Sequence, residues 1–376
     1  MCGRAFRAVV AEMRSRRTAT RWSARVQLAY LLGIIATWLL LISRSEQWLP
    51  ATMLAYGPRA VVILPLAIVL PAGALFARRS LLFGSFGAWL AISQIMGFRF
   101  TMASAEPPTR SPQSVERDLR IITLNAAADR MNRAGLDALV ARHAPDIVAL
   151  QECSADVAAS LATLQGWHTA RHHGLCTFSR WPISAPDSMP REDLVSIADL
   201  GFGGTALVVR YVVQHPTRPF QLVNLHLETA RKGLQGLLGS DGLLPDAARL
   251  PSTLPFTRGA DRVDANALIR RRESQRASAW AARDVHTMPV IVVGDFNLPV
   301  ESTIYRESWQ TWLNAFESKG RGFGYTKSEG TLLRIRIDHV LAAPQWFDVT
   351  GVWLGSDVGS DHRPVIADLV LVEMRG

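Results

Sequence analysis

The apolar positions of the chain follow two different patterns. Within the first hundred residues they form three long runs without a charged residue, about 26–43, 60–77 and 81–98, each close to the length of one membrane crossing. Beyond residue 118 they form short runs, many of them β-branched and bounded by turn residues. One long run alone would fit a signal peptide or a buried helix, but three in series predict transmembrane helices. A domain of strands and helices is predicted to follow them.

Eight short apolar runs predict strands in this second region, and three stretches predict helices. The strands are expected at 119–125, 147–151, 175–179, 206–213, 220–226, 290–294, 337–342 and 365–370. The helices are expected at 135–143, 155–164 and 264–286. Many strands with few helices between them favour an α/β domain of layered sheets flanked by helices.

Arginine positions predict the orientation of the membrane region. Seven arginines precede residue 26, and Arg78 and Arg79 lie between the second and third runs. The segment between the first and second runs carries only Arg44 and Arg59. Because cytoplasmic segments carry the excess of Arg, residues 1–25 are predicted to be a basic cytoplasmic N-terminus. Three crossings then make a multi-pass protein of the cell membrane whose later residues are extracytoplasmic.

Charge is distributed unevenly along the chain. Residues 99–117 are rich in Pro, Ser and charged residues, which predicts a linker ahead of a catalytic domain over 118–376. The formal net charge is +9, but 13 Arg and 3 Glu in residues 1–110 account for all of it. The remainder is close to neutral. A nuclease usually carries its positive charge on the folded domain, so the high pI is weak evidence for nucleic-acid binding.

The three cysteines limit the metal chemistry. Cys2, Cys153 and Cys176 show no C-x-x-C spacing, which excludes a zinc ribbon. Cys153 and Cys176 form either a disulfide, if the domain lies outside the cytosol, or two small buried thiols. The sequence leaves both alternatives open.

Polar and ionisable residues recur at the ends of the predicted strands. They are Asn125, Glu152, His226, Asp295, Asn297, Asp338, Asp361 and His362. Each alone has an ordinary structural reading as a turn residue, a helix cap or part of an Asx turn. Strand ends converge at one edge of layered sheets, however, so their recurrence predicts one functional site.

Four stretches resemble the endonuclease/exonuclease/phosphatase superfamily with the deoxyribonuclease I-like fold. They are L-R-I-I-T-L-N, P-D-I-V-A-L-Q-E, V-G-D-F-N and S-D-H-R-P-V, with weaker ones at 178–183 and 336–341. The resemblance covers about residues 118–373. It implies a four-layered α/β sandwich, with two mixed β-sheets flanked by helices, that hydrolyses phosphate esters with Mg²⁺ or Mn²⁺. With the apolar runs ahead of it, the chain resembles a membrane-anchored, bacterial-type member.

Phosphate ester hydrolysis needs an activated water, a cation and hydrogen-bond donors to the phosphoryl oxygens. Oxygen ligands suit Mg²⁺, so Glu152 and Asn125 are predicted metal ligands, and the resemblance adds Asp361. His362 is the predicted base, since imidazole titrates near neutral pH. Asp338 would hold its tautomer.

The remaining strand-end residues are expected to act on the water and the phosphoryl group. Asp295 would orient or deprotonate the water, and Asn297 and His226 would donate to phosphoryl oxygens. Ala127 stands where some members of the family carry an acidic residue, so the metal site rests on Asn125 and Glu152. No acidic partner for His226 can be assigned from the sequence.

Substrate-binding residues are expected among the arginines of the domain. Arg270 and Arg271, in I-R-R-R-E-S-Q-R, are predicted to receive a phosphate or diphosphate, the alternative being a solvated basic helix face. Arg321 could serve similarly. The segment 228–262, with paired leucines among glycines, is either a floppy loop or an apolar flap that reaches the bilayer.

These features predict a membrane-anchored, metal-dependent phosphoesterase with an extracytoplasmic catalytic domain. Its partners would be the lipid bilayer and a phosphate-containing substrate, for which a polyprenyl diphosphate or a phospholipid is expected. An extracytoplasmic nuclease acting on DNA or RNA is the alternative. A third hypothesis, an inactive binding or sensing domain, would not need the retained strand-end residues. Nothing in the sequence indicates a partner protein.

Overall fold

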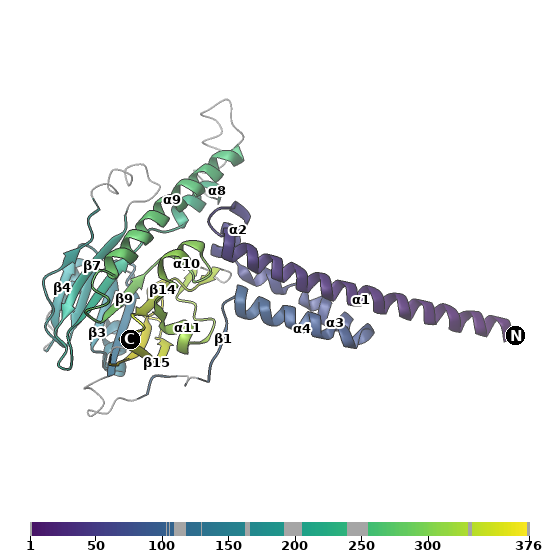
Figure 1. Cartoon of the computed structure of the whole chain (residues 1–376), viewed down its shortest axis with the longest axis horizontal. Helices are drawn as coiled ribbons and strands as arrows, with labels where there is room; N and C mark the ends of the chain where they lie inside the picture. Colours follow the sequence, from purple (N-terminus) through teal and green to yellow (C-terminus); the bar gives the residue numbers. More distant parts are fainter. Residues whose placement is uncertain are drawn as a thin grey trace.

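Two units make up the chain in the computed structural model, a helical bundle at the N-terminus and a domain built on two β-sheets (Figure 1). The structure describes residues 2–102, 104, 106–108, 118–128, 130–161, 166–191, 205–238, 255–329 and 333–373.

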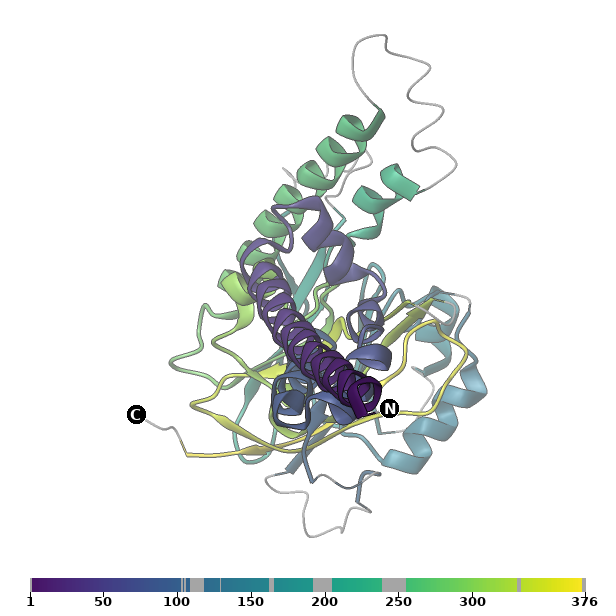
Figure 2. The same ribbon diagram turned by 90° about the vertical axis from the view of Figure 1, so that its right-hand side faces the viewer.

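The bundle is built around one long helix. Its elements are α1 (Cys2–Arg44), α2 (Leu49–Tyr56), η1 (Arg59–Ile63), α3 (Leu66–Phe76), η2 (Arg78–Ser80), α4 (Leu81–Leu90) and the π-helical turn η3 (Ala91–Ile95). Both α3 and α4 pack along α1 (Figure 1), which Figure 2 shows from its N-terminal end. Two segments, Ala11–Arg44 and Arg59–Phe76, are long and apolar enough to cross a membrane. The third predicted run, 81–98, is helical only as far as Ile95, so a third crossing stays a prediction.

The outer surface of the bundle is apolar. Among the described residues, the large hydrophobic side chains that are exposed lie at or before Met102, apart from Leu268 and Leu333. Leu75 and Leu82, for example, expose 75% and 77% of their surface. Monomeric soluble proteins rarely expose so much contiguous apolar surface, whereas a lipid-facing helix does.

One buried contact fixes how the ends of the bundle are arranged. Gln27 of α1 donates a hydrogen bond to Ser80, 3.0 Å away, at the turn between α3 and α4. Arg78 and Arg79 and the arginines that precede Gln27 therefore lie at the end of the bundle that points away from the sheet domain, where Figure 1 marks the N-terminus.

The sheet domain contains two six-stranded sheets. The first has the order β15-β16-β2-β3-β5-β4 and the second β10-β14-β9-β8-β7-β6. The first comprises β2 (Asp118–Asn125), β3 (Ile147–Gln151), β4 (His168–His172), β5 (Leu175–Ser179), β15 (Phe347–Leu354) and β16 (Val365–Leu371). The second comprises β6 (Asp187–Ser188), β7 (Leu207–Val213), β8 (Phe220–His226), β9 (Val290–Asp295), β10 (Leu313–Asn314) and β14 (Asp338–Ala342).

Helices cover the outer faces of these sheets, and the main apolar core lies between the sheets. The helices are α5 (Arg133–His143), α6 (Ala155–Leu161), α8 (Arg231–Leu238), α9 (Pro255–Ala281), α10 (Thr303–Trp309) and α11 (Ala315–Lys319). Both sheets are mixed, because β2 and β3 run parallel, as do β8 and β9, among antiparallel neighbours. The predicted α/β fold of mixed sheets flanked by helices is confirmed, as are all eight predicted strands and the three predicted helices, with shifted ends.

Short elements connect the two units. Arg99 and Phe100, expected in the linker, instead form β1 (Arg99–Phe100), which pairs with β11 (Arg321–Gly322). Later in the chain, β12 (Lys327–Glu329) and β13 (Leu333–Ile335) form a hairpin within the sheet domain. Most of the predicted linker and residues 239–254 of the expected flap lie outside the described residues.

Cys153 and Cys176 are joined by a disulfide, with their Cα atoms 6.0 Å apart. Cys153 directly follows Glu152 at the end of β3, and Cys176 lies in β5, the strand that pairs with β3. The bond therefore braces the strand end that carries Glu152. Of the two alternatives left by the sequence, the structure contains the disulfide.

A buried polar contact, here called the junction, joins the bundle to the sheet domain. The bundle contributes Ser45, Glu46, Tyr56 and Arg59, and the domain contributes Arg270, Glu301, Ser302 and Thr303. Arg59 and Glu301 form an ion pair of 2.7 Å in which both side chains are less than a tenth exposed. Buried charges persist only when they are paired, so the two units meet in one defined arrangement.

The carboxyl group of Glu273, in α9, makes stability depend on pH. Burial, and then the neighbouring carboxylate of Glu228, raise the pKa of Glu273 to about 7. Between about pH 4.5 and 7 the folded chain thus keeps a proton that the unfolded chain has lost. The free energy of unfolding therefore falls as the pH rises through that window.

Replacing Glu273 with Gln removes this titrating group. We expect Glu273→Gln to raise the free energy of unfolding at pH 8 by up to about 3 kcal/mol, and to change it little near pH 5. Denaturant unfolding of the full chain in detergent at both pH values measures the effect. A variant less stable than the wild type at pH 8 would contradict this account.

Candidate active site

His362 and Asp338 form a buried hydrogen-bonded pair at the centre of the site. The Nδ1 of His362 lies 2.8 Å from Oδ2 of Asp338, and both side chains are less than a twentieth exposed. Burial by itself would lower the pKa of His362, but the carboxylates of Asp338 and Asp295 outweigh it and raise that pKa to about 9. The carboxylate fixes the ring so that Nε2 faces the site.

Asp295 faces His362 from the adjacent strand. Its Oδ2 lies 3.7 Å from Nε2 of His362, because β9 and β14 pair with Asp295 opposite Asp338. Burial, followed by the charge of Asp338, raises the pKa of the Asp295 carboxyl. Two groups that interact this closely titrate as a pair, so His362 and Asp295 together are the candidate acceptor of a proton from water.

Asn125 and Glu152 lie beside Asp295, at the ends of the parallel strands β2 and β3. The amide nitrogen of Asn125 donates to Glu152 Oε1 at 3.1 Å and to Asp295 Oδ2 at 3.0 Å. Its oxygen accepts from the Ala127 N–H, so it points away from Glu152. Glu152 has a left-handed backbone, with φ at 47°, and its side chain is 45% exposed.

This donor set fits a hard cation at Glu152. The carboxylate is exposed enough for the cation to keep several water ligands, as Mg²⁺ does. Asn125 would join it as a ligand only after a half-turn of its amide, which a cation between Asn125 and Glu152 would favour. Glu152 is thus the group able to hold the metal, with Asn125 beside it.

A second cluster of ionisable groups, Asp295, Asp338 and His362, also has its ligand atoms within 4.8 Å of one another. These three side chains are buried and two of them already share a hydrogen bond. Such a set leaves no room for the waters that Mg²⁺ retains. We therefore read it as the proton-transfer group.

His226 and Asn297 complete the polar cluster from β8 and from the turn after β9. His226 Nε2 lies 3.7 Å from Glu152 Oε1 and 3.6 Å from Asp295 Oδ2. These two carboxylates are the acidic neighbours that the sequence left unassigned. The Asn297 side chain donates to the Leu227 carbonyl at 2.8 Å, and its N–H donates to Asp295 Oδ1 at 2.9 Å.

Asp361, expected as a metal ligand, has other partners in the structure. Its carboxylate accepts from Lys327 and lies 3.4 Å from Arg130. Partial burial alone would raise the pKa of Asp361, but Lys327, His362 and Arg130 outweigh it and lower that pKa. A carboxylate already held by two cationic side chains is a poor ligand for a third cation, so the structure argues against this role.

The arginines expected to bind substrate lie elsewhere. Arg270 is only 2% exposed, and its guanidinium donates to the carbonyls of Glu228 and Asn297 and to Tyr56 of the bundle. Arg271 pairs with Glu307 at 2.8 Å. The substrate-binding expectation is corrected for Arg270, because it is buried and its guanidinium is engaged within the protein. For Arg271, whose ion pair is partly exposed, it stays a prediction.

Two hydroxyl groups hold the site together and were missed from the sequence. Ser360 donates to the Asn125 carbonyl at 2.7 Å and accepts from the His362 N–H at 3.0 Å. Thr326 accepts from the N–H of Asp338 at 3.1 Å. Ser360 could have been found from the sequence, because it precedes Asp361 and His362 in the S-D-H motif. Thr326 lies in a polar stretch without a recognisable motif.

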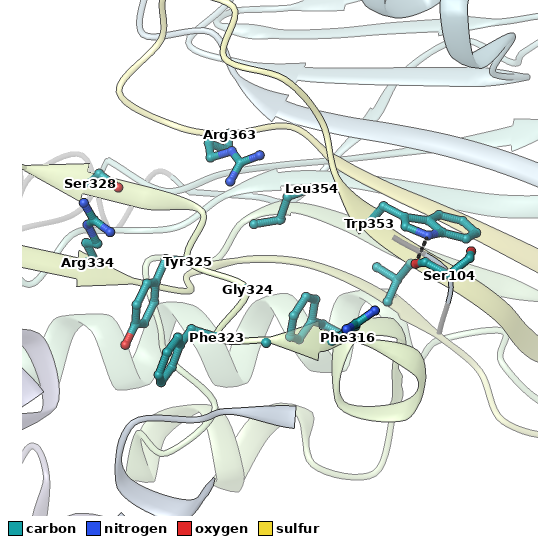
Figure 3. Close-up of a pocket in the computed structure, with 13 residues that line it drawn as sticks. Ser104, Phe316, Phe323, Gly324, Tyr325, Ser328, Arg334, Trp353, Leu354 and Arg363 are labelled. Carbon is teal, nitrogen blue, oxygen red and sulfur yellow. Dashed lines mark hydrogen bonds between the residues drawn. The ribbon is translucent and has the colours of Figure 1, made fainter. Parts of the chain in front are cut away.

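A pocket of about 740 Å³ is lined by residues of α11, β13 and β15 and by Arg363, the residue after His362. Its lining includes Arg321, Arg334 and Arg363 and the aromatic residues Phe323 and Tyr325, whose rings stack at 5.1 Å. Figure 3 shows Arg334 and Arg363 around the same hollow as the two rings. No carboxylate belongs to this lining within the described part of the chain.

Two contacts of the pocket wall reach other parts of the molecule, the S-D-H segment and the end of the bundle. The Ser328 N–H, in the wall of the pocket, donates to the Asp361 carbonyl at 3.2 Å. On another side, Phe98, just past the last helical turn of the bundle, packs edge-on against Phe323 at 4.9 Å. The pocket is therefore positively charged and close to the end of the bundle.

A sequence profile of the Endonuclease/Exonuclease/phosphatase family matches residues 122–362. The chain belongs to this family. Its members are metal-dependent hydrolases of phosphate esters, and the chain is accordingly a hydrolase acting on phosphate ester bonds. A search of curated proteins returns no match.

A search of solved structures returns several matches. An endonuclease/exonuclease/phosphatase from Bacteroides vulgatus is 18% identical, with a TM-score of 0.46 over 68% of this chain and 99% of that one. The human Nocturnin catalytic domain is 15% identical, with a TM-score of 0.43 over 70% and 100% of the two chains. A humanized TDP2 of D. rerio is 14% identical, with a TM-score of 0.45 over 67% and 98%.

The family's carboxylate–histidine pair can be tested by removing one charge. Asp338→Asn keeps the size of the side chain but removes the charge that raises the pKa of His362. We expect kcat to fall by roughly 10²- to 10⁴-fold and the acid limb of the pH–rate profile to move to lower pH. Steady-state kinetics across pH measure both, and an unmoved acid limb would contradict the pairing.

The metal site can be tested without turnover. We expect Glu152→Gln to weaken Mn²⁺ binding by about tenfold or more, because a neutral amide replaces the exposed carboxylate. Electron paramagnetic resonance of free Mn²⁺ measures this affinity. Asp156→Asn, an exposed carboxylate in α6, is the matched control. Equal affinities for the two variants would remove Glu152 from the site.

Proposed function

We propose that the chain is a membrane-anchored, divalent-metal-dependent phosphoesterase that acts at the extracytoplasmic face on a phosphate compound of the membrane or envelope. One observation carries this proposal. The catalytic cluster is attached, through the buried junction, to a bundle whose outer surface is apolar. A hydrolase held in this way acts on what lies next to a bilayer.

Two features support an extracytoplasmic position of the catalytic domain, and with it three membrane crossings. Apart from Arg44 and Arg59, the arginines of the bundle lie at the end that points away from the catalytic domain, and cytoplasmic ends carry such an excess. The domain also contains the Cys153–Cys176 disulfide, and disulfides persist mainly in oxidising compartments outside the cytosol. Charge and redox chemistry thus favour the same orientation.

The pocket supports a lipid-linked substrate. Its arginines suit phosphate oxygens, and its aromatic rings suit an apolar or planar group. It also lies near the end of the bundle, as Phe98 shows. A polyprenyl diphosphate or a phospholipid carries both kinds of group and is anchored in the bilayer. We therefore propose such a compound as the substrate.

The residues of the site divide the chemistry among them. Glu152, with Asn125, would hold Mg²⁺ or Mn²⁺, which when bound neutralises charge on the phosphoryl oxygens. The His362–Asp295 pair takes the proton from the attacking water, and Asp338 keeps the His362 ring oriented. His226 and Asn297 donate hydrogen bonds to phosphoryl oxygens as charge develops on them.

The substrate can be tested directly. The full chain, reconstituted in liposomes with Mg²⁺, is offered a polyprenyl diphosphate, a phospholipid and plasmid DNA in parallel, with His362→Ala as the control. We expect phosphate or headgroup release from a lipid, intact DNA and no turnover by the variant. DNA cleavage alone would favour a nuclease, and no turnover of any of them would favour a binding or sensing domain.

A further inference from the structure

Arg270 joins two loops that carry catalytic residues. Its Nε donates to the Glu228 carbonyl at 3.3 Å, two residues after His226. Its Nη2 donates to the Asn297 carbonyl at 3.1 Å. The two loops follow the parallel strands β8 and β9, which pair with His226 opposite Asp295. One guanidinium thus fixes the spacing of the groups that face the phosphoryl site.

The bundle covers the other side of this guanidinium. The ring of Tyr56, at the end of α2, lies 4.8 Å from the Arg270 guanidinium carbon and stacks on it, while Arg270 donates to the Tyr56 hydroxyl. The same hydroxyl donates to Glu46 Oε1 at 2.8 Å. Tyr56 therefore connects Arg270 to the buried carboxylate of Glu46, so the position of Arg270 depends on the bundle.

The bundle also holds the segment that follows Asn297. Both oxygens of Glu46 are occupied there, by the hydroxyls of Ser302 and Thr303 and by the Thr303 N–H at 2.9 Å. Arg59 pairs with Glu301 in the same segment. Asn297 itself has a left-handed backbone, with φ at 51°, a conformation that persists only where the surroundings impose it.

From these contacts we propose that the hairpin between the two candidate spans, residues 45–58, is a positioning element of the active site, together with Arg59 at the start of the second span. Tyr56 and Arg270 are positioning residues that act through the loops of His226 and Asn297. Catalytic geometry then depends on docking to the membrane bundle, and the sheet domain detached from it would be a poorer catalyst. This inference holds whichever phosphate compound is hydrolysed.

The test uses the full chain in lipid nanodiscs and the variant Tyr56→Phe, which keeps the ring and removes the hydroxyl. Tyr30→Phe is the matched control, because the Tyr30 hydroxyl donates within the bundle, to the Val62 carbonyl. With bis(p-nitrophenyl) phosphate as the probe, we expect Tyr56→Phe to lower kcat by about tenfold or more and to change KM by less than about twofold. Tyr30→Phe should change neither.

Hydrogen exchange followed by mass spectrometry gives a second readout that needs no turnover. In Tyr56→Phe we expect faster amide exchange in the segments 226–229 and 296–303, and unchanged exchange in β2 and β3. Exchange like that of Tyr30→Phe would overturn the proposal, as would faster exchange spread over the whole domain, which would indicate general destabilisation. The exchange result stands even if the probe phosphodiester is not hydrolysed.

Discussion

The guanidinium of Arg270 is the point on which bundle and catalytic domain both depend. A buried charge is tolerated only where hydrogen bonds and opposing dipoles surround it. Two loop carbonyls and the Tyr56 hydroxyl supply this environment, and the Tyr56 ring stacks over the charge. These partners come from both catalytic loops and from the bundle. The hydrogen bonds of this one buried guanidinium therefore hold the catalytic loops against the hairpin of the bundle.

The need of buried charges for polar or opposite-charge partners also organises the catalytic cluster. Asp295, Asp338 and His362 are buried together, and their charges are compatible only because an imidazole lies between two carboxylates. Sheet register produces this arrangement. The strand β9 pairs with β14 on one side, which places Asp338 next to Asp295, and with β8 on the other, which places His226 next to Asp295. Glu152 differs from these groups in being half exposed, which leaves it able to bind a hydrated cation.

Much of this could be read from the sequence because it depends on local patterns. Short apolar runs, many of them β-branched and bounded by turn residues, located the eight strands. Polar residues at the strand ends identified Asp338, His362 and Asp295 as neighbours. What the sequence could not predict depends on distant partners. Arg270 reads as a phosphate-binding or solvated helix residue until Tyr56, more than two hundred residues earlier, is placed over it. Asp361 reads as a ligand until Lys327 is placed beside it.

The strand β15 was also missed, because its pattern, F-D-V-T-G-V-W-L, interrupts the apolar residues with Asp, Thr and Gly. Its pairing with β16, which includes an irregularity between Val349 and Gly351, supplies what local propensity lacks. The choice between thiols and a disulfide for Cys153 and Cys176 likewise needed the pairing of β3 with β5, which brings these residues together.

We expect the junction itself, and not only the connecting chain, to hold the catalytic domain on the helical bundle. A protease site inserted between residues 109 and 117 allows the connecting chain to be cut in intact membranes. We expect the cleaved catalytic domain to sediment with the membranes at physiological salt, because the buried contacts of Glu46, Arg59 and Tyr56 remain. Release of the domain into the soluble fraction on cleavage would contradict the account.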